Sequence, residues 1–454
     1  MKTEYGKVYL TGAGPGDPGL ITVKATDKLK QADVVVYDRL INNDLLSYCK
    51  KGCEKIFVGK ESGHHPIEQE KITEILICKA MLGFDVVRLK GGNPFVFGRG
   101  SEEAKALKAA GIEYEIIPGI TSGLSAPIYS GIPITQRGMI TQCVLITAHE
   151  CPEKPETQVD WEKLAKLKNT SLIIYMGGSR IERIARELIR NGMNPATPAA
   201  AIENGTLPKQ RTITARLDGI ADEYKKQNLH PPVIIMVSPT ISLRDDISWY
   251  EQKPLFNKRI FISGKINNKK KLYGMITDSG GEILSIPFFE NRNRIPNESL
   301  SESIGVPMTY FHSLTPELAN FSNHTEDYSQ LDEKEFNTNN KILNAIKGYD
   351  NDSQPSEVSN SNELERESKI YSDMVLNGID AFVFGTAISI DKFFDTFGYE
   401  TADKLLSHGN VLTLDKSSAE RLFRNNIFSV KITENATVES IYSSLCNLVR
   451  TNDA

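Results

Sequence analysis

The chain has 454 residues, of which 40% are hydrophobic and 24% charged, and its formal net charge is −5. This length exceeds one ordinary hydrophobic core, so we expect at least two globular units. The negative balance argues against a general nucleic-acid binder, and the sequence contains no apolar run long enough to span a bilayer. The start MKTEYGKVYL lacks an apolar leader, which makes the cytoplasm the default location. The six cysteines lack zinc-ligand spacing, so we expect no metal site.

Up to about residue 245, apolar runs alternate with helical patterns, which predicts α/β units around mainly parallel, buried strands. Helices are expected over residues 72–80 and 181–189, each with apolar residues on one face and a glycine beyond its end. The expected strands lie at 7–12, 32–38, 85–92, 113–119, 141–149, 171–178, 198–205 and 231–239.

The first Gly-rich loop, TGAGPGDPG at 11–19, lies between an expected strand and a helix, so it invites a dinucleotide-binding hypothesis. However, Asp17 stands where the G-x-G-x-x-G pattern requires glycine, and Pro15 lacks the amide that a pyrophosphate would use. Asp17 instead fits a helix N-cap followed by Pro18 at the first helical position. Nicotinamide binding is therefore a minor alternative, beside a purely structural turn.

Charged residues directly follow two of the apolar strands. Asp38 and Arg39 follow the run at 34–37, and Lys60 follows a second strand in VGK. In α/β folds the carboxyl ends of strands meet the ligand crevice, which makes Asp38 and Arg39 candidate site residues. The alternative is a solvated strand end, and a lone lysine such as Lys60 is more often solvated than catalytic.

Two further stretches combine bare backbone with polar groups. RLKGGNPFVFGRGSEE at 88–103 places glycines, aromatic residues, an arginine and two glutamates together. PGITSGLSAPIYSGIPITQR at 118–137 gathers small residues around Thr121 and Ser122 and ends at Arg137. Small residues permit a close backbone approach to a ligand, and they equally permit close helix packing. The second stretch by itself leaves both interpretations open.

Taken together, these segments resemble a known family. GAGPGDPGLIT, ADVVVYDRL, VGK, VVRLKGGNPFVFGRGSEE, PGITS, GIPITQR, YMGG and ENGT, in this order over about residues 5–247, are similar to the uroporphyrinogen-III C-methyltransferases of the tetrapyrrole methylase superfamily. The resemblance implies two α/β lobes, at about 1–118 and 119–247, with S-adenosylmethionine between them, usually in a homodimer. The implied reaction methylates uroporphyrinogen III at C-2 and C-7 and gives precorrin-2 for sirohaem or cobalamin.

The same resemblance implies roles for individual residues. The implied methyl-donor pocket consists of Pro15, Gly91, Gly92, Asn93, Val96, Thr121, Ser122, Met176 and Gly205. The implied acceptor site, which must hold eight carboxylates, presents Arg39, Lys60, Arg99, Glu102 and Arg137. Asp38 would accept a proton and Lys60 would donate one, with Arg99 as a competing candidate for proton removal. We rank Asp38 above Arg99, because an arginine base needs a strongly lowered pKa.

Three positions depart from the family pattern. Asn93 stands where aspartate is usual, Gln136 where histidine is usual, and Ala148 where glycine is usual. Asn93 removes an anionic partner for the donor's cationic groups but keeps a hydrogen-bonding oxygen. Because the charged residues named above are all present, activity is the expectation. The departures support one alternative, a degenerate tetrapyrrole-binding protein.

A second pattern begins after residue 254. Segments at about 254–290 and 379–450 resemble one lobe of uroporphyrinogen-III synthase, which is often fused after this methyltransferase. Residues 322–368 are dense in Asn, Ser, Asp and Glu, which predicts a disordered insertion. Lys265 also departs from that family's pattern. We therefore expect residues 254–454 to form an incomplete synthase-like domain without full activity; the alternative is a bifunctional enzyme that also cyclises hydroxymethylbilane.

Overall fold

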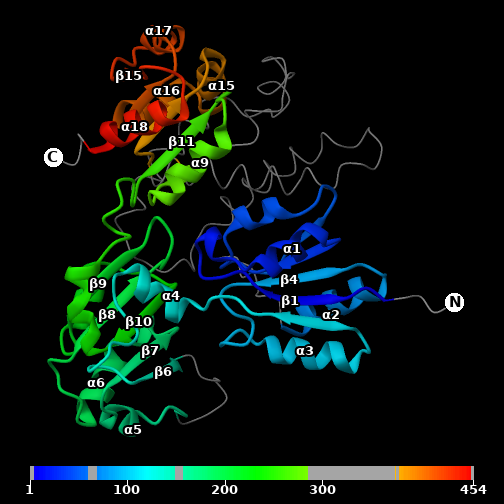
Figure 1. Ribbon diagram of the computed structural model, residues 1–454, viewed down its shortest axis with the longest axis vertical. Coiled ribbons are helices and arrows are strands. Elements are labelled where there is room, and N and C mark those ends of the chain that lie inside the picture. The colour runs from blue at the N-terminus through cyan, green and yellow to red at the C-terminus, as the bar shows by residue number, and fades with distance from the viewer. Residues whose placement is uncertain (1–4, 60–68, 149–156, 285–373, 375–377, 451–454) are drawn as a thin grey trace, which may run out of the picture. The chain divides into compact units, whose positions relative to one another are not determined.

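The computed structural model describes residues 5–59, 69–148, 157–284, 374 and 378–450 (Figure 1). The chain divides into two compact units, Met1–Phe256 and Asn257–Ala454. Unit 1 contains two five-stranded sheets, each belonging to one lobe, and the described part of unit 2 contains one. The α/β fold class predicted from the sequence is confirmed, while the family assignment of the predicted domain ranges stays a prediction.

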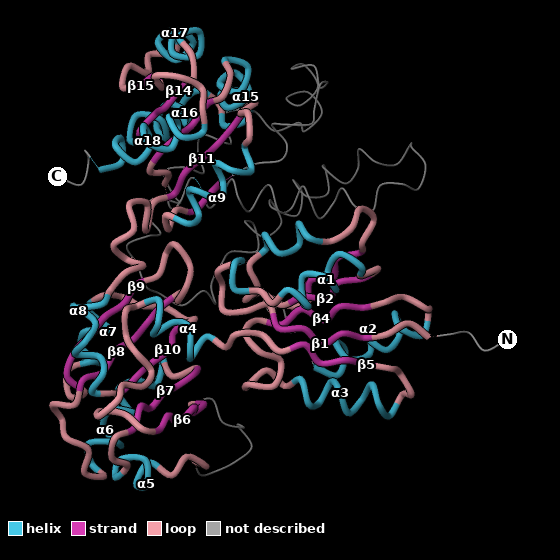
Figure 2. The backbone as a smooth tube through the Cα atoms, in the orientation of Figure 1, coloured by secondary structure: helices cyan, strands magenta, loops and turns pink. Residues whose placement is uncertain are grey.

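The N-lobe of unit 1 has a fully parallel sheet in the order β3-β2-β4-β1-β5. Its strands are β1 (Val8–Gly12), β2 (Val34–Tyr37), β3 (Glu54–Phe57), β4 (Val86–Lys90) and β5 (Tyr114–Ile117). Its helices are η1 (Pro18–Leu20), α1 (Val23–Gln31), η2 (Asn43–Tyr48), α2 (Gln69–Met81) and α3 (Gly100–Ala109). Helices cover both faces of this sheet (Figure 2).

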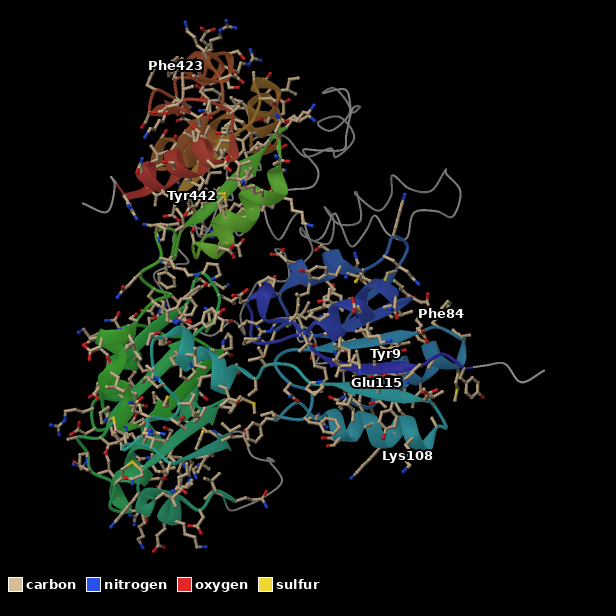
Figure 3. All side chains as sticks on the ribbon, viewed as in Figure 1. Tyr9, Phe84, Lys108, Glu115, Phe423 and Tyr442 are labelled. Carbon is tan, nitrogen blue, oxygen red and sulfur yellow. The ribbon has the colours of Figure 1, made fainter. Side chains whose placement is uncertain are left out.

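Alternating residues on the N-lobe strands decide which helices cover which face. Val34 and Val86 face α2 and α3, whereas Val35 faces α1 and η2, because successive strand residues point to opposite sides. Figure 3 labels Tyr9 and Glu115, which are register partners on β1 and β5. Both faces of the sheet are therefore buried, as is typical of parallel sheets.

The C-lobe has a mixed sheet in the order β6-β7-β10-β8-β9. Its strands are β6 (Gln142–Thr147), β7 (Thr170–Tyr175), β8 (Pro198–Glu203), β9 (Arg211–Arg216) and β10 (Val233–Val237). Its helices are α4 (Ser122–Tyr129), α5 (Trp161–Lys166), η3 (Gly178–Arg180), α6 (Ile181–Arg190), α7 (Ile220–Lys226), η4 (Pro239–Leu243) and α8 (Arg244–Ile247). The core on one face is formed with α5, α6 and α7, and the core on the other with α4.

The C-lobe sheet differs from the mainly parallel sheet that the sequence predicted. β6 and β7 are parallel, but β10 runs antiparallel to β7 and β8, and β8 runs antiparallel to β9. Residues 204–210 join β8 to β9, and this connection is too short for the crossover that parallel neighbours require. β9 was not predicted, because this partly exposed edge strand lacks an apolar run.

Both helices predicted from apolar periodicity are confirmed. The expected helix at 72–80 is the central part of α2, which buries Ile72, Leu76 and Ala80. The expected helix at 181–189 is α6. Gly192, two residues beyond the end of α6, has a φ of 102°, a left-handed conformation that glycine adopts at helix ends.

Unit 2 has a parallel sheet in the order β12-β11-β13-β14-β15. Its strands are β11 (Arg259–Ser263), β12 (Glu282–Leu284), β13 (Ala381–Phe384), β14 (Asn410–Thr413) and β15 (Val430–Ile432). Its helices are α9 (Lys269–Asp278), α15 (Ala387–Phe397), α16 (Tyr399–His408), α17 (Lys416–Arg424) and α18 (Val438–Arg450).

The core of unit 2 is rich in phenylalanine. Phe261, Phe382, Phe384 and Phe393 are completely buried, and their rings contact one another. This cluster gives unit 2 a hydrophobic core of its own. The predicted insertion at 322–368 lies outside the described residues. Across the described parts of both units, none of the helices has the length and apolar character needed to cross a membrane.

Candidate functional site

The carboxyl ends of β1, β4 and β5 meet at three glycines. A Cβ atom placed on Gly119 would lie 2.2 Å from the carbonyl oxygen of Gly92 and 2.8 Å from the Cα atom of Gly12. The backbone of Gly14 also pairs with Gly92, with N to O distances of 2.7 and 3.2 Å. Only bare backbone fits at Gly12 and Gly119, which allows a direct approach of main chain to main chain, whereas Gly92 supplies the approaching carbonyl and a left-handed φ of 67°.

The first Gly-rich loop ends in the N-cap that the sequence predicted. The Oδ1 atom of Asp17 accepts a hydrogen bond of 2.7 Å from the backbone of Gly19, and Pro18 begins η1. The half-buried Pro15 lies in the same loop. Asp17 and Pro15 therefore occupy the positions at which a dinucleotide-binding loop would need a glycine and a free backbone amide.

Asn93 uses both polar groups of its side chain inside its own loop. Its Nδ2 atom donates to the carbonyl oxygen of Gly119 at 3.0 Å, and its Oδ1 atom accepts from the backbone of Phe95 at 2.9 Å. The hydrogen-bonding oxygen that the sequence analysis left for a ligand is thus already engaged in a turn. Asn93 ties the loop after β4 to the loop after β5.

The start of α4 lies against β7 of the C-lobe sheet. Thr121 is the N-cap residue, and its hydroxyl lies 2.8 Å from the hydroxyl of Tyr175. The same tyrosine oxygen accepts a 3.0 Å hydrogen bond from the backbone of Gly123, where an added Cβ would lie 2.2 Å away. A Cβ on Gly205 would lie 2.3 Å from the Cβ of Ala126 in α4. Close packing therefore explains the small residues at Gly123 and Gly205.

Five non-glycine residues with left-handed backbones lie in loops that carry predicted site residues, and five asparagines with such backbones lie elsewhere in the described residues. Their φ angles are 54° for Phe97, 57° for Arg99, 55° for Met176, 50° for Asn204 and 73° for Thr206. Such conformations are rare outside glycine, and they persist only where the surrounding structure enforces them. The ring of Phe97, for example, packs edge-on against Tyr175 at 5.0 Å between centroids. Strain of this kind clusters at functional sites.

Asp17 links the N-lobe to the C-lobe of unit 1. Its backbone nitrogen donates to the hydroxyl of Thr206 at 3.1 Å, and its Oδ2 atom accepts from the hydroxyl of Tyr129 at 2.7 Å. Burial, together with the nearby Asp17 carboxylate, raises the pKa of Tyr129 above its ordinary value of 10.0. Tyr129 therefore stays a neutral donor at neutral pH. In addition, Val96 of the N-lobe packs on the C-lobe core beside α4.

Asp38, the predicted proton acceptor, lies just beyond the end of β2. Its Oδ1 atom pairs with the Nη2 atom of Arg88 at 2.6 Å, and 29% of its side chain is exposed. Arg88 also pairs with Glu103 at 3.2 Å, and Lys90 pairs with Glu103 at 2.9 Å. Burial, followed by the neighbouring Arg88 charge, lowers the pKa of Lys90.

Arg88, Lys90 and Glu103 were missed by the sequence analysis. The signal was present, because VVRLK places two cations in a strand that is otherwise apolar and fully buried. Buried cations need counter-charges, but the sequence does not say which carboxylate supplies them.

Arg99 and Glu102 form an exposed bidentate pair with distances of 3.0 and 2.7 Å. The hydrogen bond and charge of Glu102 raise the pKa of Arg99 above its ordinary value. An arginine base requires the opposite shift, which argues against the proton-removing role considered for Arg99. The pair remains available as a polar edge of an acceptor site.

The remaining predicted cations lie at exposed positions or outside the described residues. Arg39 and Arg137 are exposed, and the described residues contain no ion-pair partner for either. Lys60 lies outside the described residues. Gly59, the residue before Lys60, lies beside Arg39, since a Cβ on Gly59 would be 2.7 Å from the backbone nitrogen of Arg39.

The other predicted donor-pocket residues occupy loops at the strand ends. Gly91 and Ser122 are half-buried, and a Cβ on Gly91 would lie 3.2 Å from the Cβ of Leu40. Met176 is 49% exposed beside the buried Tyr175. Gln136 is exposed, and its carbonyl accepts the 2.9 Å bond from Ile140 that closes a turn. Gly91 and Met176 directly follow β4 and β7, whereas the Gln136 turn precedes β6.

Comparison with known proteins assigns this pair of α/β lobes, with its glycine junction at the N-lobe strand ends, to the tetrapyrrole methylase class. The model of the family Tetrapyrrole (Corrin/Porphyrin) Methylases matches residues 7–221. A uroporphyrinogen-III C-methyltransferase of Methanocaldococcus jannaschii is 48% identical over 241 residues, which are 53% of this chain and 98% of the relative. The chain belongs to the tetrapyrrole methylase family, and the resemblance drawn from its motifs is confirmed.

Other relatives are longer than the matched region. A uroporphyrinogen-III C-methyltransferase of Bacillus subtilis is 40% identical over 305 residues, 67% of this chain and 63% of that protein. A siroheme synthase of Yersinia pestis is 44% identical over 251 residues, 55% of this chain and 52% of that protein. The chain thus spans about half to two thirds of these relatives. The Bacillus match is longer than unit 1, which ends at Phe256, so it extends into unit 2.

Solved structures of this family match the same part of the chain. The native uroporphyrin III C-methyl transferase of Thermus thermophilus is 38% identical, with a TM-score of 0.45 over 52% of this chain and all of that one. A complex of the Thermus enzyme with S-adenyl homocysteine is 37% identical, with a TM-score of 0.44 over 52% of this chain and 93% of that one.

Proposed function

We propose that this protein transfers methyl groups from S-adenosylmethionine to C-2 and C-7 of uroporphyrinogen III, which gives precorrin-2 for sirohaem or cobalamin. The observation that carries the proposal is Asp38, a partly exposed carboxylate held by Arg88 at the strand ends of a tetrapyrrole methylase fold. The names of the Methanocaldococcus and Bacillus relatives support the substrate. The Yersinia siroheme synthase supports the sirohaem branch.

The methyl donor fits the glycine junction. The donor supplies an electrophilic methyl group on a sulfonium, and the protein must place that group against a pyrrole carbon. Gly91 carries no side chain of its own, Gly92 holds the loop by pairing with Gly14, and Met176 and Val96 offer apolar surface. We assign the donor to these residues together with Pro15, Asn93, Thr121, Ser122 and Gly205. Asn93 contributes by shaping the loop, because both polar groups of its side chain are engaged there.

The acceptor carries carboxylates, and two kinds of cation are available for them. Arg39 and Arg137 are exposed and have no ion-pair partner among the described residues, so their full charge is available. Arg99 is already paired with Glu102 and must share its charge. We therefore assign carboxylate binding mainly to Arg39 and Arg137, with Arg99 and Glu102 at the edge of the site.

The proton that leaves the methylated ring requires an acceptor. Asp38 is assigned this role because its Oδ1 atom is bound to Arg88 and Oδ2 remains for a substrate proton. Lys60 is assigned as the proton donor by its match to the family motif. We further propose a cytoplasmic homodimer, as the family resemblance implies. For unit 2 we propose that full synthase activity is lacking, since its described residues form only one sheet.

Anaerobic incubation with uroporphyrinogen III and labelled S-adenosylmethionine tests the proposal. We expect two labelled methyl groups per product. Asp38→Ala should lower kcat by about 100-fold or more, because general base catalysis contributes that much. Binding of S-adenosylhomocysteine, measured by calorimetry, should change little. Asp27→Ala is the matched control, since Asp27 pairs with Lys30 on the surface of α1.

Two outcomes would favour the alternatives. Porphyrinogen binding without methyl transfer would indicate a degenerate tetrapyrrole-binding protein. Fluorescence quenching by NAD, without binding of S-adenosylhomocysteine, would indicate a nicotinamide-dependent enzyme.

A further inference from the structure

A buried charge cluster lies directly behind Asp38. It contains Arg88, Lys90 and Glu103, which are 1%, 4% and 0% exposed. The Oε1 atom of Glu103 accepts from Arg88 at 3.2 Å, from Lys90 at 2.9 Å and from Gln69 at 2.8 Å. Burying charged groups costs free energy unless they are paired, so we looked for a function that this cluster could serve.

All four charged side chains come from one side of the N-lobe sheet. Asp38, Arg88 and Lys90 follow the even-numbered positions of β2 and β4 that face α2 and α3, and Glu103 comes from α3. Two positive and two negative groups balance one another. Of the four, only Asp38 has a substantial exposed fraction, 29% of its side chain. The cluster therefore presents a single carboxylate to the site and buries the groups that hold it.

We propose that Arg88 is a positioning residue that fixes the orientation of the Asp38 carboxylate, that Glu103 fixes Arg88 in turn, and that Lys90 holds Glu103. This inference rests on the proposed methyl transfer. Arg88 binds Asp38 through Nη2 at 2.6 Å and Glu103 through Nε at 3.2 Å, while Nη1 donates to the carbonyl of Val36 at 3.3 Å. All three guanidinium nitrogens are thus engaged, and the side chain cannot turn without breaking several bonds.

The arrangement determines which oxygen of Asp38 is available. Oδ1 is bound to Arg88 at 2.6 Å, so the carboxylate plane is fixed and Oδ2 is the oxygen left for the substrate. A base must lie within hydrogen-bonding reach of the proton that it removes, and small displacements cost large factors in rate. Lysine could replace the charge of Arg88, but it could not bind Asp38, Glu103 and Val36 simultaneously in one plane.

The test is a double-mutant cycle in the full chain with Arg88→Lys and Asp38→Asn, measured as labelled methyl transfer under single-turnover conditions. Arg88→Lys alone should lower the rate by about 10- to 100-fold, with little change in the affinity for S-adenosylhomocysteine. In the Asp38→Asn background the same change should lower the residual rate by less than about two-fold. Lys79→Met is the control, because it removes the 2.7 Å pair with Glu54 at the opposite end of β3.

Equal losses in both backgrounds would overturn the inference, since Arg88 would then act through general stability. If Arg88→Lys fails to fold, Glu103→Gln repeats the cycle with a change that keeps the shape of the side chain. A smaller rate loss that again disappears with Asp38→Asn is expected; an additive loss would overturn the inference. Wild-type protein without methyl transfer would instead overturn the proposed function itself.

Discussion

At Asn93, a single amide decides how two loops of the site are joined. The Nδ2 donor to the carbonyl of Gly119 exists only in asparagine, whereas Oδ1 accepts from the backbone of Phe95 as an aspartate would. Asn93→Asp should place a carboxylate oxygen against a carbonyl oxygen. We expect the free energy of unfolding in urea to fall by about 1–3 kcal/mol. The affinity for S-adenosylhomocysteine should fall with it.

Asn93→Ser is the companion variant, because it keeps a small polar acceptor without adding charge. If Asn93→Asp leaves stability unchanged and tightens donor binding, the residue tunes the charge of the pocket and does not join the loops.

Residue-scale prediction succeeded where a pattern was local. The N-cap at Asp17 and the need for glycine at position 92, whose φ is 67°, follow from neighbouring residues and are present. The partner of Arg88 was not predictable, because Asp38 and Glu103 lie 50 and 15 positions away in the sequence. The positive φ of Met176 also escaped prediction, since the surrounding fold imposes it.

At the scale of elements, the first turn of α4 depends on β7, a strand of the C-lobe sheet. Its N-cap Thr121 makes no capping bond of its own, and the hydroxyl of Tyr175 on β7 accepts from the Gly123 backbone at 3.0 Å. Tyr175→Phe removes that acceptor from a buried amide. We expect the free energy of unfolding to fall by about 1–3 kcal/mol, measured by urea denaturation.

Tyr48→Phe is the control for this change, since 39% of Tyr48 is exposed. A loss no larger than that of the control would show that water or a neighbouring group satisfies the Gly123 amide when the tyrosine hydroxyl is removed.

Elements were predicted best where burial is complete. β10 is buried throughout and stands out as an apolar run, whereas β9 carries arginine and threonine at an edge and gives no such signal. The direction of β10 was not predictable either, because strand polarity is decided by the connections between elements and by pairing across the sheet.

At the scale of the molecule, each unit has a core of its own, so the units should separate. Unit 1 ends at Phe256, and the Methanocaldococcus relative matches over 98% of its length without an equivalent of the rest of the chain. We expect a fragment of residues 1–256 to fold cooperatively. Its kcat for methyl transfer should lie within about three-fold of the full chain.

Thermal unfolding and the labelled-methyl assay check this expectation together. Unit 2 is tested separately by supplying the full-length protein with hydroxymethylbilane and identifying the macrocycle that forms. Because unit 2 is proposed to lack full synthase activity, only the uncatalysed type-I macrocycle should form. A fragment that aggregates or loses activity would show that unit 2 supports the methylase lobes.

The junction of Gly12, Gly92 and Gly119 limits how this site can change during evolution. A larger residue in a protein core is often accommodated when a neighbour becomes smaller. Here Gly12 and Gly119 block each other, the carbonyl oxygen of Gly92 blocks both, and no residue is smaller than glycine. A substitution at Gly12 or Gly119 therefore has no compensating partner at the junction. Selection for variants that restore a Gly119→Ala protein should recover the original glycine, and not paired replacements at the junction.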